Sequence, residues 1–190
     1  MQPGPQRGFS DEGSFEAHIG LGGNLDPELY LPKAIPEIVS RMSVLATSRF
    51  YRTPPFHPLH VRQPPYVNGV MHVRVSMGPW DLKFRVLREI ESRIGRVRTE
   101  DAFAPRVIDL DLLLFGQVQV RSEELTLPDP DIYVRPFWAI PLAELLPDLP
   151  VPKTSLRLHE LAARMQSERV VYLEPLTREI RHLLGLSHPA

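Results

Sequence analysis

The chain has 190 residues, of which 43% are hydrophobic and 24% are charged, and its formal net charge is −1. This size and composition are typical of one globular domain. The near-neutral charge argues against a protein that binds nucleic acid through bulk positive charge. The lack of cysteine excludes disulfides and thiolate metal sites, and no apolar run reaches the roughly 20 residues that a membrane-spanning helix needs.

The N-terminal segment, residues 1–17, is rich in glycine, proline and acidic side chains. We expect it to form a flexible tail, followed by a single domain over residues 18–190. The segment lacks the apolar stretch of a secretory signal, and its acidic residues argue against a mitochondrial transit peptide. The sequence therefore predicts a cytoplasmic protein.

The domain is expected to begin with a short strand over residues 18–21, which ends at a glycine pair. Asp26 and Pro27 predict the start of a helix, with a capping acid and a proline at the first helical position. Pro32 and Pro36 lie inside this helix. Because an interior proline costs about 3 kcal/mol or more, we expect the helix to be kinked or to begin later.

The middle of the chain contains the clearest periodic signals. Residues 42–51 and 66–76 each favour a strand, and a proline-rich loop joins them. A helix is expected to start after Gly78 and to end at Gly95, because its apolar residues recur at intervals of three and four, namely Trp80, Phe84, Leu87, Ile90 and Ile94.

The C-terminal part predicts shorter elements after a strand that ends near residue 115. In order, we expect a short strand over 118–121, a proline-rich segment over 128–152, a helix from 154 to about 165, a strand over 170–173 and a helix over 175–184.

Two carboxylates lie two residues apart in the apolar run at residues 107–115. Side chains alternate across a strand, so Asp109 and Asp111 would share one face. The core face would carry Ile108, Leu110, Leu112 and Leu114. Two adjacent carboxylates repel each other, and a divalent cation such as Mg²⁺ would relieve that repulsion. For an isolated Asp-x-Asp pair, a solvated or arginine-paired strand face is the alternative.

Three arginines lie close to this pair in the sequence, Arg96, Arg98 and Arg106. The planar guanidinium group donates two parallel hydrogen bonds and stays charged, which suits it to binding phosphate. Arginines beside aspartates are also ordinary salt-bridge partners. The local sequence alone leaves both interpretations open.

Together these motifs resemble the 6-hydroxymethyl-7,8-dihydropterin pyrophosphokinase family. The resemblance covers roughly residues 18 to 152 and runs in order through Gly-Gly-Asn-Leu at 22–25, residues 48–55, Pro-Tyr-Val-Asn at 65–68, Glu91, Gly-Arg-Val-Arg at 95–98, Ala-Pro-Arg-Val-Ile-Asp-Leu-Asp-Leu-Leu at 104–113, residues 125–128, Arg135, Phe137, and Pro141-Leu142. The ordered set is far more specific than any of its members.

The resemblance implies an α+β fold with a ferredoxin-like core, in which a mostly antiparallel sheet is flanked by helices, and a C-terminal helical extension. It also implies a magnesium-dependent transferase of folate biosynthesis. Such an enzyme moves pyrophosphate from ATP, its co-substrate, to the hydroxymethyl group of 6-hydroxymethyl-7,8-dihydropterin and releases AMP. We expect a monomer that binds these small molecules and binds neither nucleic acid nor membrane.

The resemblance also assigns roles to residues. Asp109 and Asp111 would hold two Mg²⁺ ions and act in catalysis with Arg96 and Arg106. The nucleotide would be bound by Glu91, Arg96, Arg98, Arg106, Ile108 and Arg135. The pterin would be bound by Thr53, Pro54, Phe56, Tyr66, Asn68 and Phe137. Taken alone, without the rest of the pattern, Tyr66 and Phe137 are more typical of core aromatics, and Asn68 of a residue that forms a turn at a strand end.

The chain departs from the family pattern at several positions. It has Gly23 where the family usually has serine, Phe103 where it has tryptophan, and Asp129-Pro130 where it has a His-Tyr pair. An aspartate at position 129 would repel phosphate unless another cation or an arginine intervened.

Other interpretations remain open. A non-catalytic relative that binds pterin or nucleotide is the main alternative. A ferredoxin-like RNA-binding module would need an aromatic RNP-type motif, which the sequence lacks. His57 and His60 have the spacing of metal ligands, but no third ligand accompanies them.

Overall fold

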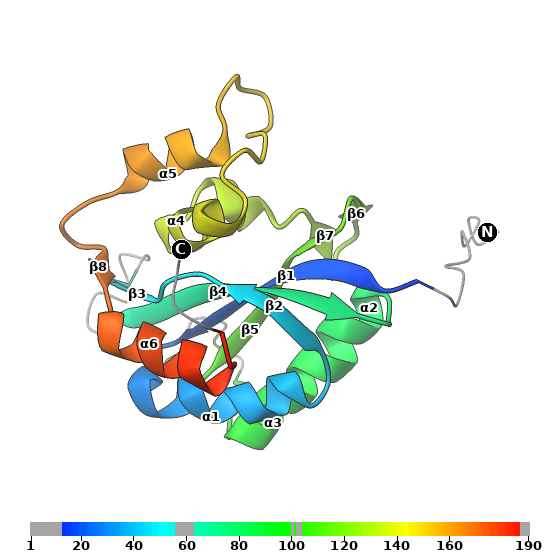
Figure 1. Ribbon diagram of the computed structural model, residues 1–190, viewed down its shortest axis with the longest axis vertical. Coiled ribbons are helices and arrows are strands. Elements are labelled where there is room, and N and C mark those ends of the chain that lie inside the picture. The colour runs from blue at the N-terminus through cyan, green and yellow to red at the C-terminus, as the bar shows by residue number, and fades with distance from the viewer. Residues whose placement is uncertain (1–12, 56–62, 100, 102–103, 187–190) are drawn as a thin grey trace.

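The computed structural model describes residues 13–55, 63–99, 101 and 104–186. An antiparallel sheet lies between two layers of helices (Figure 1). The bounds of the elements are β1 Phe15–Gly23, α1 Pro27–Val39, β2 Ser43–Thr47, β3 Tyr51–Thr53, β4 Tyr66–Val75, α2 Pro79–Asp81, the π-helical segment η2 Leu82–Leu87, α3 Arg88–Ile94, β5 Asp109–Phe115, β6 Val120–Arg121, β7 Thr126–Leu127, the 3₁₀ helix η3 Pro130–Tyr133, α4 Pro136–Leu145, α5 Leu158–Met165, β8 Val171–Tyr172 and α6 Glu174–Leu183.

The strand order confirms the predicted α+β class. Within the described residues, the main sheet runs β5-β1-β4-β3-β8, with β2 also paired to β4, and each of these pairs is antiparallel. The chain passes through a strand, a helix, three strands, a helix and a strand, one strand more than predicted between the two helices. Strand β5 lies at one edge of the sheet. Its outer backbone edge is therefore free to accept contacts from side chains such as Glu91.

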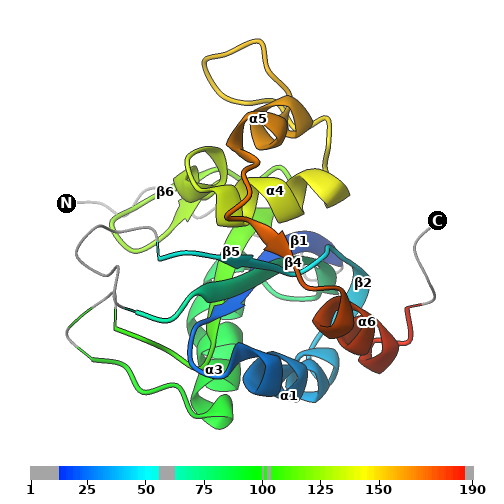
Figure 2. The same ribbon diagram turned by 90° about the vertical axis from the view of Figure 1, so that its left-hand side faces the viewer.

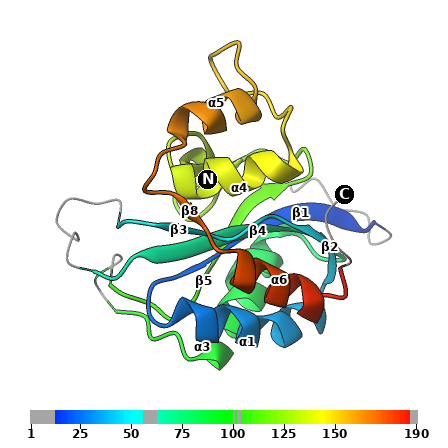
Figure 3. The ribbon, with the colours of Figure 1, turned by 60° about the vertical axis from the view of Figure 1, so that its left-hand side comes forward.

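The two faces of the sheet are covered by different helices. Helices α1, α3 and α6 lie on one side, and α4 and α5 lie on the other (Figure 3). The first side holds the larger apolar core, which includes Ile19, Leu21, Ile35, Met71, Ile90 and Leu112. The second holds a smaller cluster around Val70, Leu113, Trp138 and Leu142. This second side, the α4 face, also carries the polar residues described below.

Strand β5 largely follows the predicted alternation. Ile108, Leu110 and Leu112 belong to the larger core, as expected. Leu114 was expected beside them but belongs to the cluster under α4. The reason is a β-bulge, since Ile19 pairs with Leu112 while His18 pairs with Leu114, which leaves Leu113 as an extra residue. One extra residue reverses the facing of everything after it.

The helix predicted between Gly78 and Gly95 is present, and Gly95 ends it with φ 105°. Its central six residues are π-helical, which the apolar spacing does not predict. In this segment Leu82 and Leu87, five positions apart, are both fully buried, whereas Trp80 is 41% exposed. Trp80 is therefore not the buried anchor that a regular helix would make it, although it stacks on Phe84.

Other predicted boundaries shift. Helix α1 begins at Pro27 and runs through Pro32 and Pro36, because its buried face outweighs the missing hydrogen bonds. The predicted strand 42–51 divides into β2 and β3. Between them, the Ser48 hydroxyl oxygen accepts a hydrogen bond from the backbone N–H of Val70 at 2.8 Å. Asp26 precedes the helix but makes no side-chain capping bond.

The ends of the chain differ in similar ways. Strand β1 begins at Phe15, inside the segment predicted as a tail, and residues 1–12 lie outside the described part. The proline-rich segment 128–152 contains helix α4, which the sequence did not predict because Pro136 and Pro141 lie within it. The C-terminal helix, strand and helix are all present. Within the described residues, no helix has the length and apolar character needed to cross a bilayer.

Candidate active site

Three paired residues form a row across the α4 face of the sheet. Gly22 of β1 pairs with Asn68 of β4 on one side and with Asp109 of β5 on the other. Residues paired directly across antiparallel strands project to the same face. Strands lie about 4.8 Å apart, so roughly 10 Å of sheet separates the backbones of Asn68 and Asp109. Glycine between them leaves room for the Asn68 amide, because a Cβ on Gly22 would overlap its oxygen.

The two carboxylates of β5 are each paired with cations. Asp109 accepts hydrogen bonds from Arg96 and, at 2.6 Å, from Arg106. Asp111 accepts one from the Lys83 ammonium at 2.9 Å. Burial and the nearby charge of Asp109 raise the pKa of Asp111, although Lys83 opposes this. Arg96, Arg106 and Lys83 thus compensate the negative charge of the two partly buried acids.

Glu91 fixes this cluster from the neighbouring helix. Its side chain, 2% exposed, accepts the backbone N–H of Leu110 at 2.7 Å on the outer edge of β5. The same carboxylate also binds Arg96 and Arg98. A buried carboxylate needs such partners. Glu91 therefore attaches α3 to the edge strand and orients Arg96 toward Asp109.

Asn24 joins the two loops that border the row. Its side-chain oxygen accepts the backbone N–H of Arg106 at 2.8 Å, and its amide nitrogen donates to Gln63 and to the carbonyl of Pro64 at 3.3 and 3.4 Å. The segments leading into β4 and β5 accordingly lie at the same end of the sheet (Figure 2). This asparagine, 2% exposed, explains how residues far apart in sequence meet at one site.

Two other residues predicted to bind pterin, Thr53 and Tyr66, lie close to Asn68 in the sheet. Thr53 pairs with Tyr66, so both project to the same face as Asn68. The buried hydroxyl of Thr53 and the buried amide nitrogen of Asn68 have no hydrogen-bond partner within the described residues. Pro54 is partly buried beside them, and Phe137 lies at the start of α4, in edge-to-face contact with Trp138.

The remaining predicted residues are more dispersed. Ile108 is fully buried in the larger core, so its side chain faces away from the row. Arg98 is half-exposed beside Glu91. Arg135 precedes α4, and its Nε lies 3.3 Å from Asp131. Phe56, Phe103, His57 and His60 lie outside the described residues.

Sequence reasoning overlooked two functional candidates. Lys83 was given no role, and a lysine in an amphipathic helix gives no signal of its own until the π-helical segment places it against β5. Asn24 was quoted only as part of a motif. Asp129, which was noted as a departure, begins η3. Burial, together with the charge of Asp111 and despite a backbone hydrogen bond, raises its pKa to about 6.

Comparison with known proteins identifies close relatives. The chain is 38% identical to a 2-amino-4-hydroxy-6-hydroxymethyldihydropteridine pyrophosphokinase of Synechocystis, over 84% of this chain and 80% of the relative. It is 33% identical to the enzyme of the same name from Haemophilus influenzae, over 84% of this chain and 98% of the relative.

Solved structures share the fold. A wild-type Plasmodium falciparum HPPK-DHPS with pterin and p-hydroxybenzoate aligns with a TM-score of 0.63 at 12% identity, over 86% of this chain. The same protein with pteroate gives a TM-score of 0.64 at 11% identity, over 83% of this chain. The present chain covers about half of these longer chains, 48% and 47%.

A family model also matches residues 18–147, which contain the row from Asn68 to Asp109 and its arginines. Its extent agrees with the strands, helices and polar cluster described above. The chain therefore belongs to the 7,8-dihydro-6-hydroxymethylpterin-pyrophosphokinase family.

Proposed function

We propose that this chain transfers a pyrophosphoryl group from ATP to the hydroxymethyl group of 6-hydroxymethyl-7,8-dihydropterin and releases AMP, as a step of folate biosynthesis. The observation that carries the proposal is the row Asn68–Gly22–Asp109. On one side of Gly22 lies the Asn68 amide, which can hydrogen-bond a heterocycle. On the other side lies the cluster of carboxylates and guanidinium groups around Asp109, which can bind a triphosphate. Family membership supports the same reaction.

The pterin is proposed to lie over the Asn68 side of the row. A buried polar group without a partner costs about 1 to 3 kcal/mol, and both Asn68 and Thr53 carry such a group. The donor–acceptor edge of a pterin can supply the missing partners, because an amide offers a donor and an acceptor together. Tyr66, Phe137, Pro54 and Phe56 are the proposed contacts to its ring.

The triphosphate is proposed to lie over the Asp109 side. Arg96 and Arg106 would bind its oxygens, aided by Arg98 and Arg135, while Glu91 orients Arg96. Ile108 would contribute through its backbone, since its side chain is in the core. The guanidinium groups of Arg96 and Arg106 pair with Asp109 in the structure, so nucleotide binding would exchange one anionic partner for another.

The donor set at β5 fits magnesium. Carboxylate oxygens are its preferred protein ligands, and Asp109 and Asp111 lie close enough for the charge of Asp109 to raise the pKa of Asp111. Asp109 and Asp111 would hold two Mg²⁺ ions, which when bound supply positive charge against the triphosphate oxygens.

The transfer itself needs no covalent enzyme intermediate. The pterin hydroxyl oxygen forms a bond to the β-phosphorus of ATP, and the bond from that phosphorus to the oxygen of the α-phosphate breaks. AMP leaves with that oxygen, and the hydroxyl proton passes to solvent. The arginines stabilise the charge that develops on the transferred group.

Measuring AMP release from ATP with hydroxymethyl-dihydropterin tests the reaction directly. We expect AMP to form only when the pterin and a divalent cation are both present. A folded protein that binds pterin and ATP but forms no AMP would instead be the non-catalytic relative. Light scattering and cell fractionation would test the accompanying proposals of a cytoplasmic monomer.

A further inference from the structure

Lys83 differs from the other lysines of the chain. The sequence contains three, and Lys33 and Lys153 are both exposed. Lys83 lies in the π-helical segment η2, where its side chain is 21% exposed and its Nζ lies 2.9 Å from the Asp111 Oδ1. π-helical turns often occur at functional sites. Burial lowers the pKa of Lys83, but the charge and hydrogen bond of Asp111 outweigh it and raise the pKa.

A second carboxylate, that of Asp129, lies within electrostatic range of the same ammonium group. The charge of Asp129 also raises the pKa of Lys83, and Lys83 in turn opposes the rise in the pKa of Asp129. Asp129 is held in place because its backbone N–H donates to the carbonyl of Leu113 at 2.9 Å and its side chain accepts the N–H of Asp131 at 2.9 Å. Asp129 is thus attached to β5 two residues beyond Asp111, the acid that Lys83 contacts.

This arrangement supplies the cation that Asp129 requires. An aspartate beside a triphosphate is unfavourable unless a positive charge intervenes, and Lys83 provides one from a different helix. The same ammonium group is hydrogen-bonded to one oxygen of Asp111, a proposed metal ligand, and so competes with a divalent cation for that carboxylate. Lysine suits both purposes, because its compact charge moves freely on a flexible stem.

We propose that Lys83 is a positioning residue that holds Asp111 while no metal is bound and moves to Asp129 when a divalent cation takes Asp111. The inference rests on the proposed function, since it assumes that Asp111 is a metal ligand. Lys83 then lowers the affinity of the free protein for the cation, and it neutralises Asp129 when the site is loaded.

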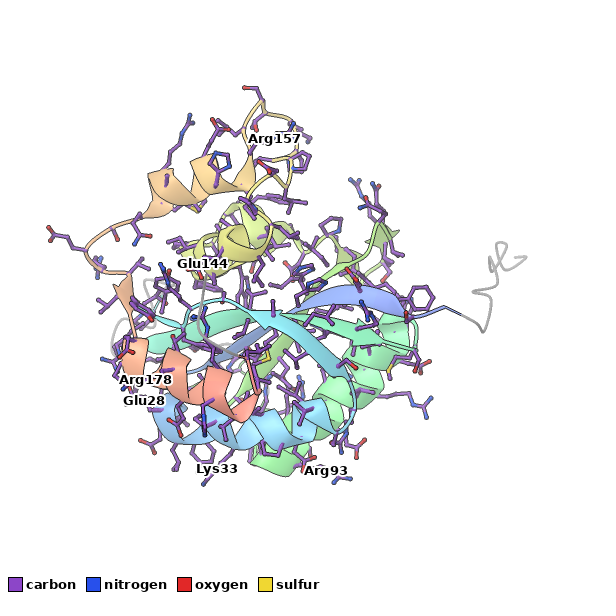
Figure 4. The ribbon with its side chains drawn as sticks, viewed as in Figure 1. Glu28, Lys33, Arg93, Glu144, Arg157 and Arg178 are labelled. Atoms are coloured by element: carbon purple, nitrogen blue, oxygen red, sulfur yellow. The ribbon has the colours of Figure 1, made fainter. Side chains whose placement is uncertain are left out.

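Binding of Mn²⁺ to the full chain without nucleotide, followed by electron paramagnetic resonance, tests the first part. Loss of the competing ammonium in Lys83→Met should tighten Mn²⁺ binding by about fivefold. Lys83→Arg keeps a cation and should bind Mn²⁺ less tightly than Lys83→Met. Lys33→Met is the matched control, because Lys33 lies on α1 at the outer side of the molecule (Figure 4), and it should bind like the wild type. Equal affinities for Lys83→Met and wild type would overturn the inference.

Lysine-selective ¹³C labelling tests the movement. Three lysines give three Cε signals, and the one missing from Lys83→Met belongs to Lys83. We expect Mg²⁺ to shift this signal and to leave the others in place. In Asp129→Asn the shifted signal should move to the position of an exposed lysine, because the second partner is gone.

An unmoved Lys83 signal at saturating Mg²⁺ would overturn the inference even if the protein releases AMP. Conversely, displacement of Lys83 without any AMP release would overturn the proposed reaction while supporting the role of Lys83. Failure of either cation to bind any of the variants would overturn both the Lys83 inference and the metal assignment.

Discussion

The α4 face of the sheet has a packed half and a polar half, which meet within two residues of β1. Over Gly20 lies the indole ring of Trp138, so closely that a Cβ on Gly20 would overlap it. Over Gly22 lies the amide of Asn68, next to the acids of β5. At both positions the missing Cβ lets another side chain lie against the backbone of β1. At Gly20 that side chain is the apolar Trp138 ring, and at Gly22 it is the polar Asn68 amide.

The contrast explains the charge pattern of β5. Asp111 pairs with Gly20 and so lies at the border of the packed half, whereas Asp109 pairs with Gly22 inside the polar half. Asp111 therefore has a raised pKa and a single cation partner, while Asp109 is held by two arginines. Neighbouring acids on one strand thus occupy different environments, and the boundary between the two halves is what distinguishes them.

The largest expected effect is a loss of activity when an acid of the polar half is removed. Asp109→Ala or Asp111→Ala should reduce AMP formation by about 10³-fold or more, because each removes a carboxylate that the transfer needs. Both variants should remain folded, since neither side chain belongs to the apolar core, although each leaves a partly buried cation without its partner. Asp81→Ala, which removes an exposed acid on α2, is the control and should keep its activity. Near-normal turnover by a folded Asp109→Ala protein would refute the metal assignment.

The next largest effect is a loss of stability when the packing of Trp138 on Gly20 is disturbed in the packed half. Gly20→Ala should lower the free energy of unfolding by about 3 kcal/mol, because the added methyl group displaces the Trp138 ring from its place against β1. Gly78→Ala is the matched control. An added Cβ there meets no atom within 4 Å, so its stability should stay within about 0.5 kcal/mol of wild type. Urea unfolding of both variants measures the difference.

A third effect concerns the far end of the packed half, where the His18 ring stacks on the His72 ring with 4.5 Å between the ring centroids. Burial and the charge of His72 lower the pKa of His18 to about 4, below its value of 6.5 in the unfolded chain. The stability that His18 contributes is therefore present above pH 6.5 and lost as the pH falls toward 4. We expect a loss of about 2 kcal/mol between pH 7 and pH 5.

Denaturant unfolding at several pH values checks this expectation. His18→Gln should remove that part of the pH dependence, because glutamine does not titrate. His182→Gln, on the exposed side of α6, should leave the slope as in the wild type. An unchanged slope in His18→Gln would show that another group is responsible.

The sequence predicted the polar half better than its surroundings. Alternation alone put Asp109 and Asp111 on one face, because a strand has a strict period of two. It misplaced Leu114, because nothing in the residues marks the bulge at Leu113. It missed α4 because proline content argues against a helix, and it missed Lys83 because the π-helical segment changes the period that the prediction assumed. Tertiary packing decided each of these features.

Two substitutions should separate the ligands within the polar half. Asn68→Ala should weaken pterin binding by about 1.5 kcal/mol, or roughly tenfold in Kd, because it removes the amide that matches the pterin edge. Its ATP affinity should be unchanged. Arg106→Ala should weaken ATP binding and leave pterin binding intact. Calorimetry with each ligand would reveal the reverse pattern if the two sides of the row were assigned the wrong way round.

The smallest expected effect comes from adding a methyl group at Gly22, the polar counterpart of Gly20. Gly22→Ala places a methyl group against the Asn68 oxygen, which is the end of a short flexible side chain and can rotate away more easily than the Trp138 ring. We therefore expect Gly22→Ala to lose about 1 kcal/mol of pterin affinity, through a misplaced amide, with less loss of stability than Gly20→Ala. Combining Gly22→Ala with Asn68→Ala should add little to the affinity loss, because both changes act through one amide. Additive losses would mean that Gly22 contributes to the site independently of Asn68.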